Sequence, residues 1–110
     1  MEYKNEVRLR GILTEIRPLP RGNRTMYQFK VKTLRAFVDK DGNTRSNEEE
    51  HHCVAWPGRA IPAEKLRALR PGNIIFVTGH LCYKPQTYVF AESLTVSKES
   101  ATGMNPSMKI

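Results

Sequence analysis

Apolar and polar residues alternate near the start of the chain, and this pattern predicts a β-strand. Over residues 6–13, Val7 and Leu9 would face one side of the strand while Arg8 and Arg10 face the other. A period of two is typical of a strand with one buried face and one face in water. We therefore expect this segment to lie at the surface of a sheet.

The clearest alternation lies in residues 26–34. Tyr27 and Phe29 would point into a core, whereas Lys30 and Lys32 would point away from it. Aromatic and β-branched residues are also the types that favour strands. This pattern predicts a second strand, with Tyr27 and Phe29 among the residues of the core.

The rest of the chain is divided by its turn residues. Further strands are expected at residues 51–56, 73–83 and 88–96. Prolines and a Gly-Asn pair predict a loop at residues 17–25, which would end the first strand. The polar segment 38–50 has Asp-Gly near its centre and is expected to be the loop at the tip of a long hairpin.

One short helix is expected among these strands, at residues 61–72. Pro62 suits a first helical turn, and Pro71 with Gly72 would end the helix. The order of elements is then three strands, a helix and two strands. This order predicts an all-β OB fold, a Greek-key barrel of five strands with a helix between the third and the fourth. An SH3-like barrel usually has no helix here, and a ferredoxin-like domain needs two.

The 110 residues are enough for one domain. We expect a domain at residues 1–96 and a flexible tail at 97–110, which has no periodicity and few apolar residues. The two cysteines form no CxxC motif, the N-terminus has no apolar signal region, and no apolar run approaches the ~20 residues of a membrane span. These features predict a cytoplasmic protein with free thiols, no membrane segment and no cofactor.

The charge of the chain narrows the class of partner. Lys and Arg number 18 and Asp and Glu number 11, so that the formal net charge is +7 and the pI is near 9.7. A small domain this basic favours an anionic partner, chiefly nucleic acid or acidic lipid. A basic protein without such a partner is the simpler alternative.

Four segments, in the same order along the chain, resemble the bacterial single-stranded DNA-binding protein family. They are NEVRLRG at residues 5–11, EEHHCVAWPGRA at 49–60, LRPGNIIFVTGHL at 69–81 and YVFAESLTV at 88–96. The resemblance implies a protein without enzymatic activity that coats single-stranded DNA as a homo-oligomer, a dimer or a tetramer. The segment PSMKI stands where the family has an acidic tip, which indicates a divergent member or one closer to the primosomal DNA-binding proteins.

The resemblance also implies roles for individual residues. Phe37 stands where the family has a stacking Trp, and His51 stands at another stacking position. His52 matches a His that the family places near a subunit contact. Pro57 and Gln86 stand where the family commonly has aromatic residues, so part of the usual stacking surface is replaced.

Basic residues of the first two strands are expected to form the binding surface. If these strands pair as in an OB barrel, Arg8, Arg10, Lys30 and Lys32 would gather on one face. Bases would stack on Phe37 and on Tyr83 or Tyr88, and phosphates would pair with the cations. The candidate nucleic-acid-binding residues are Arg8, Arg10, Lys30, Lys32, Arg35, Phe37, His51, Arg59, Arg70, Tyr83 and Lys84.

The segment 48–58, EEEHHCVAWPG, contains residue types that could do other chemistry. If Val54 faces the core, alternation places His52 and Trp56 there too and turns His51 and Cys53 outward. The one Trp is then expected to be a core residue rather than a stacking surface.

A zinc site or a Cys-His catalytic pair is not expected in this segment. Adjacent strand residues point to opposite faces, the C-x₂-C knuckles of zinc sites are missing, and no oxyanion loop is recognisable.

Two functions from different classes remain open on the sequence. The first is sequence-tolerant binding of single-stranded DNA in replication, recombination or repair. RNA remains an alternative ligand, because backbone charge and stacking do not read the sugar. The second is an assembly module of a replication-restart or mobile-element complex, which contacts a partner protein while DNA binding is secondary.

Overall fold

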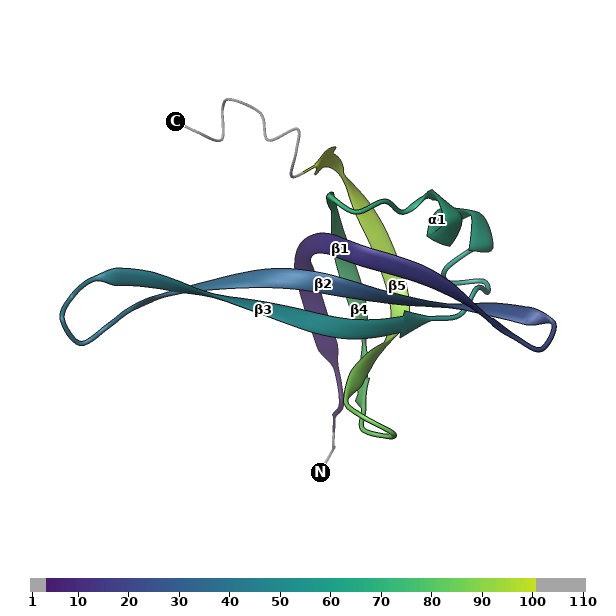
Figure 1. The fold of residues 1–110 in the computed structure, drawn as a ribbon, viewed down its shortest axis with the longest axis horizontal. Helices are drawn as coiled ribbons and strands as arrows, with labels where there is room; N and C mark the ends of the chain where they lie inside the picture. The colour runs from purple at the N-terminus through teal and green to yellow at the C-terminus, as the bar shows by residue number, and fades with distance from the viewer. Residues whose placement is uncertain (1–3, 101–110) are drawn as a thin grey trace.

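The computed structural model describes residues 4–100, which form a closed β-barrel with one short helix (Figure 1). Around the barrel the strands follow the order β1-β2-β3-β5-β4. The elements are β1 (Val7–Arg21), β2 (Arg24–Val38), β3 (Thr44–Ala55), α1 (Ala63–Ala68), β4 (Asn73–Cys82) and β5 (Tyr88–Ser100). The prediction of a five-stranded OB barrel with a helix between β3 and β4 is confirmed.

The strand β1 has different neighbours along its two halves. Residues 7–12 pair with β4, and from Ile12 onward the strand pairs with β2. Gly11 lies at this change of partner, and a Cβ atom there would collide with the backbone oxygen of Lys32. The absence of a side chain at Gly11 therefore allows β2 to approach β1 where the barrel closes.

The first hairpin is longer than the sequence pattern predicts. The loop expected at residues 17–25 is mostly strand, because β1 continues through Pro18 and Pro20 to Arg21. The turn itself is at Gly22, whose φ of 64° favours glycine. In this part of β1 only β2 is a neighbour, so it is an edge strand, and an edge tolerates the missing N–H of proline.

The second hairpin forms a long two-stranded extension of the barrel. The segment 38–50 does contain the turn, but β3 already begins at Thr44, so only residues 39–43 lie between the strands. We call residues 33–49, which pair as β2 with β3, the arm. In Figure 1 the arm extends to the left, clear of the barrel.

The helix is shorter and the last strand longer than expected. Only α1 is helical within residues 61–72, with Pro62 at its N-cap. β5 continues to Ser100, which pairs with Asn73, so the first residues of the expected tail are strand. The remainder of that tail, residues 101–110, lies outside the described residues. Within the described part, no helix has the length and apolar character needed to span a membrane.

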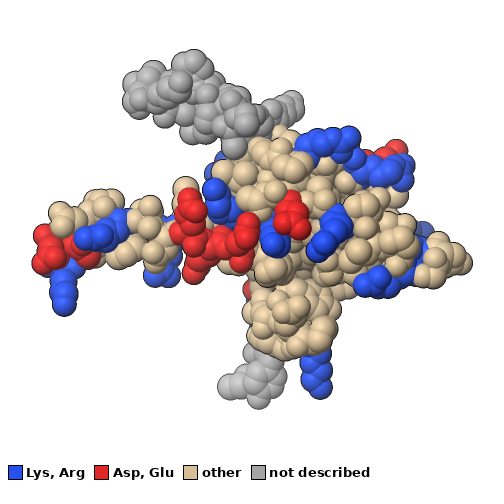
Figure 2. Space-filling view, in the orientation of Figure 1, with Lys and Arg blue, Asp and Glu red and all other residues tan. Residues whose placement is uncertain are grey.

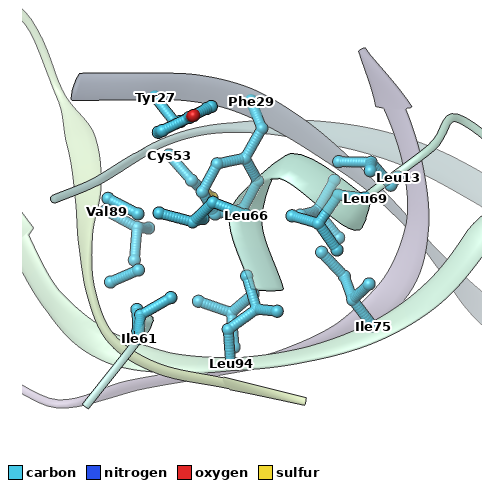
Figure 3. Packing of buried hydrophobic residues seen from close by; sticks show 14 residues of the cluster. Leu13, Tyr27, Phe29, Cys53, Ile61, Leu66, Leu69, Ile75, Val89 and Leu94 are labelled. Carbon is cyan, nitrogen blue, oxygen red and sulfur yellow. The ribbon is translucent and has the colours of Figure 1, made fainter. Parts of the chain in front are cut away.

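The core fills the barrel and the space under α1 (Figure 3). Tyr27 and Phe29 are buried, as the alternation of β2 predicts. Leu66 and Leu69, from α1 and the residue after it, point into the barrel and close one end of it. The buried residues are Leu13, Tyr27, Phe29, Val31, Cys53, Ala55, Ile61, Leu66, Leu69, Ile75, Val77, Val89, Ala91 and Leu94.

The expected orientation of β3 is wrong. Cys53 is 1% exposed and Ala55 is fully buried, whereas His52 is exposed and Trp56 is only half-buried. The register places Cys53 opposite the buried Phe29, so the small residues of β3 face the interior. Aromatic and leucine side chains from other elements already fill this space, so there is room for cysteine and alanine but not for an indole.

Candidate nucleic-acid interface

A groove of about 560 Å³ lies on the outside of the barrel. Its floor is formed by β2 and β3, one end by the β1–β2 hairpin, and one wall by residues 84–88 between β4 and β5. In OB folds, this face and the loops beside it are where oligonucleotides bind. We refer to this feature as the groove.

The floor of the groove consists of outward-facing side chains of β2 and β3. Gln28 pairs with Val54, and Lys30 pairs with His52. These four residues line the groove because they alternate with the buried residues of the same strands. The reversed orientation of β3 is therefore what puts His52 and Val54 in the groove.

Trp56 forms part of the groove next to the β1–β2 hairpin. The guanidinium of Arg24 lies over the indole, 4.8 Å from the ring centroid, and its Nη2 donates a hydrogen bond of 3.2 Å to the carbonyl oxygen of Pro57. A cation over an indole is an attractive arrangement, and the hydrogen bond holds it in place. Arg24 thus ties the hairpin to the end of β3 and fixes the position of Trp56.

Four basic side chains line the groove. Arg17 and Arg21 come from the end of β1, Lys30 from β2, and Lys84 from the loop after β4. The acidic residue among the lining residues is Glu15, whose Oε1 lies 3.4 Å from Nζ of Lys30. Both partners are partly exposed, and such pairs contribute only ~0–1 kcal/mol, so a phosphate can compete for Lys30. The groove is therefore positive and open to an anion.

The wall formed by residues 84–88 includes Tyr88, at the start of β5. A hydrogen bond with the side chain of Cys82 raises the pKa of the Tyr88 phenol above its ordinary value. The phenol is therefore uncharged at neutral pH and adds no negative charge to the groove. An uncharged ring of this kind can contact a nucleic-acid base without repelling the adjacent phosphate.

The structure places only some of the predicted binding residues in the groove. Lys30 and Lys84 line it, and so does His52, for which the sequence predicts a subunit contact. Tyr83 is 63% exposed at the start of the β4–β5 loop, next to the groove. Arg59 is exposed in the segment between β3 and α1.

A second group of predicted residues lies on or near the arm. Lys32 shares the outward face with Lys30, and its Nζ lies 3.7 Å from Oε2 of Glu48. Arg35, Phe37 and His51 alternate with Lys32 and so belong to the opposite face of the ribbon. These three residues therefore do not lie on the face of the sheet that forms the groove.

His51 also makes a specific contact on that opposite face. Its Nε2 is hydrogen-bonded to Oγ1 of Thr33 at 2.9 Å, and its register partner is the buried Val31. The expectation that His51 turns outward is therefore wrong.

The prediction that Arg8 and Arg10 gather with Lys30 and Lys32 is wrong. It requires the first residues of β1 to pair with β2, and they do not. Arg8 and Arg10 pair with residues of β4, since β1 pairs with β2 only from Ile12 onward. The guanidinium of Arg10 lies over Phe76, 5.4 Å from the ring centroid. The two arginines thus lie along β4 rather than beside the two lysines.

Two further predicted cations have local partners. Arg8 forms an ion pair with Glu6 at 3.1 Å, and both side chains are largely exposed. Nη1 of Arg70 donates hydrogen bonds to the carbonyl oxygens of Arg67 and Leu69, at the end of α1. Arg70 therefore satisfies helix carbonyls that would otherwise lack a donor.

Acidic side chains gather at the base of the arm, on β3. Glu48, Glu49 and Glu50 are exposed residues of β3, and Glu50 is the register partner of Lys32. Figure 2 shows acidic side chains gathered where the arm leaves the barrel, and basic ones on the barrel and toward the β1–β2 hairpin. A phosphate backbone would be repelled by the first region and attracted by the second.

Sequence reasoning missed the residues at the hairpin end of the groove: Arg17, Arg21, Arg24 and Trp56. All three arginines fall within the segment 17–25, for which the sequence predicts a loop, and the alternation of residues 51–56 predicts a core position for Trp56. A signal for them exists in the chain, because three arginines in the first hairpin are a local excess of positive charge. Only the register of β3, however, brings Trp56 next to them.

Neither cysteine lies in a group of described residues that could hold a metal ion. Among residues 4–100, no group of three or more His, Cys, Asp or Glu side chains lies close enough together to hold a metal ion. Burial raises the pKa of the Cys53 thiol to about 12, so at neutral pH this sulfur carries its proton. Cys82 is half-buried and forms no disulfide.

Comparison with known proteins gives likenesses in structure. No model of a known protein family matches the chain, and no curated protein matches it in sequence. The structure of a Plasmodium falciparum SSB in complex with ssDNA has a TM-score of 0.74 and 18% identity, covering 89% of this chain and 98% of that one. A deletion mutant of the single-stranded DNA-binding protein from Thermus aquaticus has a TM-score of 0.69 and 27% identity, covering 86% of this chain and 51% of that one.

The protein PriB of Ralstonia solanacearum is similar as well. Its TM-score is 0.67 at 15% identity, and the match covers 86% of this chain and all of that one. Identities this low show the fold. The chain is therefore a divergent OB-fold protein whose structural neighbours are single-stranded DNA-binding proteins and PriB, in agreement with the resemblance that its sequence motifs indicate.

Proposed function

We propose that the chain binds single-stranded DNA in the groove without strong preference for sequence. The observation that carries the proposal is the combination, in one groove at the OB binding position, of four cations with the half-buried indole of Trp56. Phosphates would pair with Arg17, Arg21, Lys30 and Lys84, and a base would stack against Trp56. A role in DNA replication, recombination or repair would follow from this activity.

The cations account for affinity rather than for specificity. Each phosphate that they neutralise releases counterions, and for single strands the slope of log affinity against log salt is roughly −0.7 per contact. Four contacts would give a slope of roughly −3. A cation reads the charge of the backbone and not the identity of a base, which supports sequence-tolerant binding.

The aromatic surface accounts for the preference for single strands. Stacking of a base on an aromatic side chain contributes ~1–3 kcal/mol, and it requires a base that is not already stacked in a duplex. Because Arg24 holds Trp56 in position, little side-chain freedom remains to be lost on binding. Tyr88, in the wall formed by residues 84–88, offers a second uncharged ring.

The structural neighbours support this proposal at the level of fold. One of them is an SSB whose structure is a complex with ssDNA, and others are single-stranded DNA-binding proteins. On this proposal the chain acts by binding rather than by catalysis. RNA would be bound by the same charges and stacking, so DNA and RNA must be compared directly.

Trp56 gives a direct test, because it is the one tryptophan of the chain and it lines the groove. Oligo-dT titrated into the protein should quench Trp56 fluorescence, and the affinity should fall with salt at the slope given above. Oligo-rU and a duplex of the same length serve as comparisons. Absence of salt-dependent binding to oligo-dT would refute the proposal and favour an assembly module that contacts a partner protein.

A further inference from the structure

Gln28 is a polar residue on the floor of the groove that the binding of phosphates does not use. Its side chain faces outward from β2, and its register partners are Arg17 of β1 and Val54 of β3. All three residues line the groove, and Gln28 is half-buried there. A glutamine amide has an oxygen that accepts hydrogen bonds and a nitrogen that donates them. The orientation of the amide therefore decides which ligand atoms it can bind.

Arg17 sets the orientation of this amide. Nη2 of Arg17 donates a hydrogen bond to Oε1 of Gln28 over 3.5 Å. A guanidinium has donors only, so the reverse orientation of the amide would place N–H groups against N–H groups and lose this bond. The amide oxygen therefore faces β1. The nitrogen, Nε2, has no hydrogen-bond partner among residues 4–100 and can donate to a ligand in the groove.

The side chains that flank this amide, along and across the strands, add donors and apolar groups. Lys30 and Arg17 can only donate hydrogen bonds, and Met26 and Val54 are apolar. Glu15 is the acidic residue of the lining, and its carboxylate is already paired with Lys30. The part of the floor around the amide therefore favours a ligand atom that accepts a hydrogen bond.

A base stacked on Trp56 would present its edge to this amide. Trp56 lies two residues after Val54, the register partner of Gln28, and lines the same groove. Side chains at such diagonal positions across two strands are within reach of one another when they are long or aromatic. His52, whose ring can also accept a hydrogen bond, is the register partner of Lys30 and so lies toward the other end of this floor.

We propose that Gln28 binds the edge of the base stacked on Trp56 and gives the groove a preference for keto bases over amino bases. Thymine and uracil have an oxygen acceptor at the position where cytosine has an amino group, which can only donate. Nε2 of Gln28 can donate to the oxygen, whereas it would meet the amino group donor against donor. This preference rests on the proposed function and adds a choice of base to it.

The preference would be modest. A single hydrogen bond of this kind changes an affinity by about 2- to 12-fold. Cations bind the phosphates whatever the base, so every sequence would still be bound. The groove would thus remain tolerant of sequence while it favours strands rich in keto bases.

Oligo-dU and oligo-dC of equal length test the preference, because the two bases have rings of the same size and differ at this edge. At neutral pH and fixed salt, the unaltered chain should bind oligo-dU about 2- to 12-fold more tightly than oligo-dC. Gln28→Leu should bind the two oligomers alike and keep the slope of affinity against salt. Gln86→Leu makes the same change at another glutamine of the groove and should keep the preference.

Gln28→Glu should reverse the preference. A carboxylate only accepts hydrogen bonds, so it would favour the amino group of cytosine. Affinity for both oligomers should fall, because a negative charge enters a positive groove. The ratio of the two affinities is the measured quantity, and a general loss of folding would not invert it.

The outcomes separate this preference from the proposed function. Equal, salt-dependent binding of oligo-dU and oligo-dC by the unaltered chain would overturn the role of Gln28 and leave DNA binding in the groove intact. A preference that survives in Gln28→Leu, or that is lost equally in Gln86→Leu, would overturn it too. Failure of both oligomers to bind the unaltered chain would overturn the proposed function as well.

Discussion

The two hairpins that extend from the barrel have similar backbones and different surfaces. The β1–β2 hairpin is basic, its outer edge contains prolines, and it ends beside Trp56 and the groove. The arm is acidic at its base and apolar along β2, and at this base Glu48 forms an ion pair with Lys32, just outside the arm. Figure 2 shows this change of charge along the molecule.

This difference indicates that the two hairpins favour different kinds of partner. The backbone of a two-stranded ribbon offers the same hydrogen-bonding groups in both places, so side chains decide what may approach it. Cations beside an aromatic ring favour an unpaired nucleic-acid strand, whereas an apolar edge without proline favours another β-strand. The following predictions test whether the two hairpins are as different as this comparison holds.

Loss of the Trp56 indole should have the largest effect on DNA affinity. Trp56→Ala should weaken binding of oligo-dT by about 5- to 150-fold, since a stacked base contributes ~1–3 kcal/mol. Trp56→Phe should recover most of the affinity, and the matched arm variant Phe37→Ala should change it little. Affinity measured by fluorescence anisotropy of a labelled oligonucleotide checks all three, and a larger loss for Phe37→Ala would reverse the comparison.

Loss of hairpin cations should change the salt dependence. Arg17→Ala with Arg21→Ala should reduce the magnitude of the log–log salt slope by roughly 1.4, which is two contacts at roughly 0.7 each. Arg35→Ala with Arg45→Ala removes the same charge from the arm and should leave the slope unchanged. If both double variants change the slope equally, net charge rather than position determines binding.

Removal of the edge prolines should make the outer edge of the first hairpin better able to pair with another strand. Pro18→Val with Pro20→Thr restores N–H groups and β-forming side chains to the outer edge of β1, so we expect a modest increase in self-association. Sedimentation velocity measures it, with Pro71→Ala, outside the strands, as the control. No change in association would show that the prolines do not protect this edge.

The smallest effect is expected at the tip of the arm. The Arg45 side chain and the backbone N–H of Asn43 donate hydrogen bonds to Asp39 and lower the pKa of its carboxyl below the ordinary value. A lowered pKa means that the stabilisation is present above the unfolded value and is lost as pH falls through the folded pKa. NMR signals of the tip should shift in that range, and Asp39→Asn should shift them at neutral pH without changing DNA affinity; a change in affinity would place the tip in the binding site.

Much of the fold could be predicted from local patterns. The alternation of residues 26–34 correctly places Tyr27 and Phe29 in the core, and the order of elements correctly predicts the OB barrel. These inferences succeed because a side chain's position relative to its neighbours along a strand depends only on the strand itself. The prolines at 18 and 20 misled the prediction because an edge strand tolerates what a central strand does not.

The candidate site was less predictable because it depends on which residues meet across strands. Lys30 and Lys84 were identified from their charge, and both line the groove. The prediction of a core position for Trp56 fails because alternation along β3 allows either face to be the buried one. The grouping of Arg8 and Arg10 with the lysines fails because β1 changes its partner at Ile12. The alternation of apolar and polar residues along β1 does not predict this change.

The sequence by itself thus determined that the chain alternates as strands, carries an excess of positive charge and orders its elements as an OB barrel. Only the tertiary structure decided which face of β3 is buried, where β1 changes its partner, and which cations share a groove with Trp56. The reason is that these properties are set by register between strands distant in the chain. A shift of one residue there exchanges the inner and outer faces without altering any local pattern.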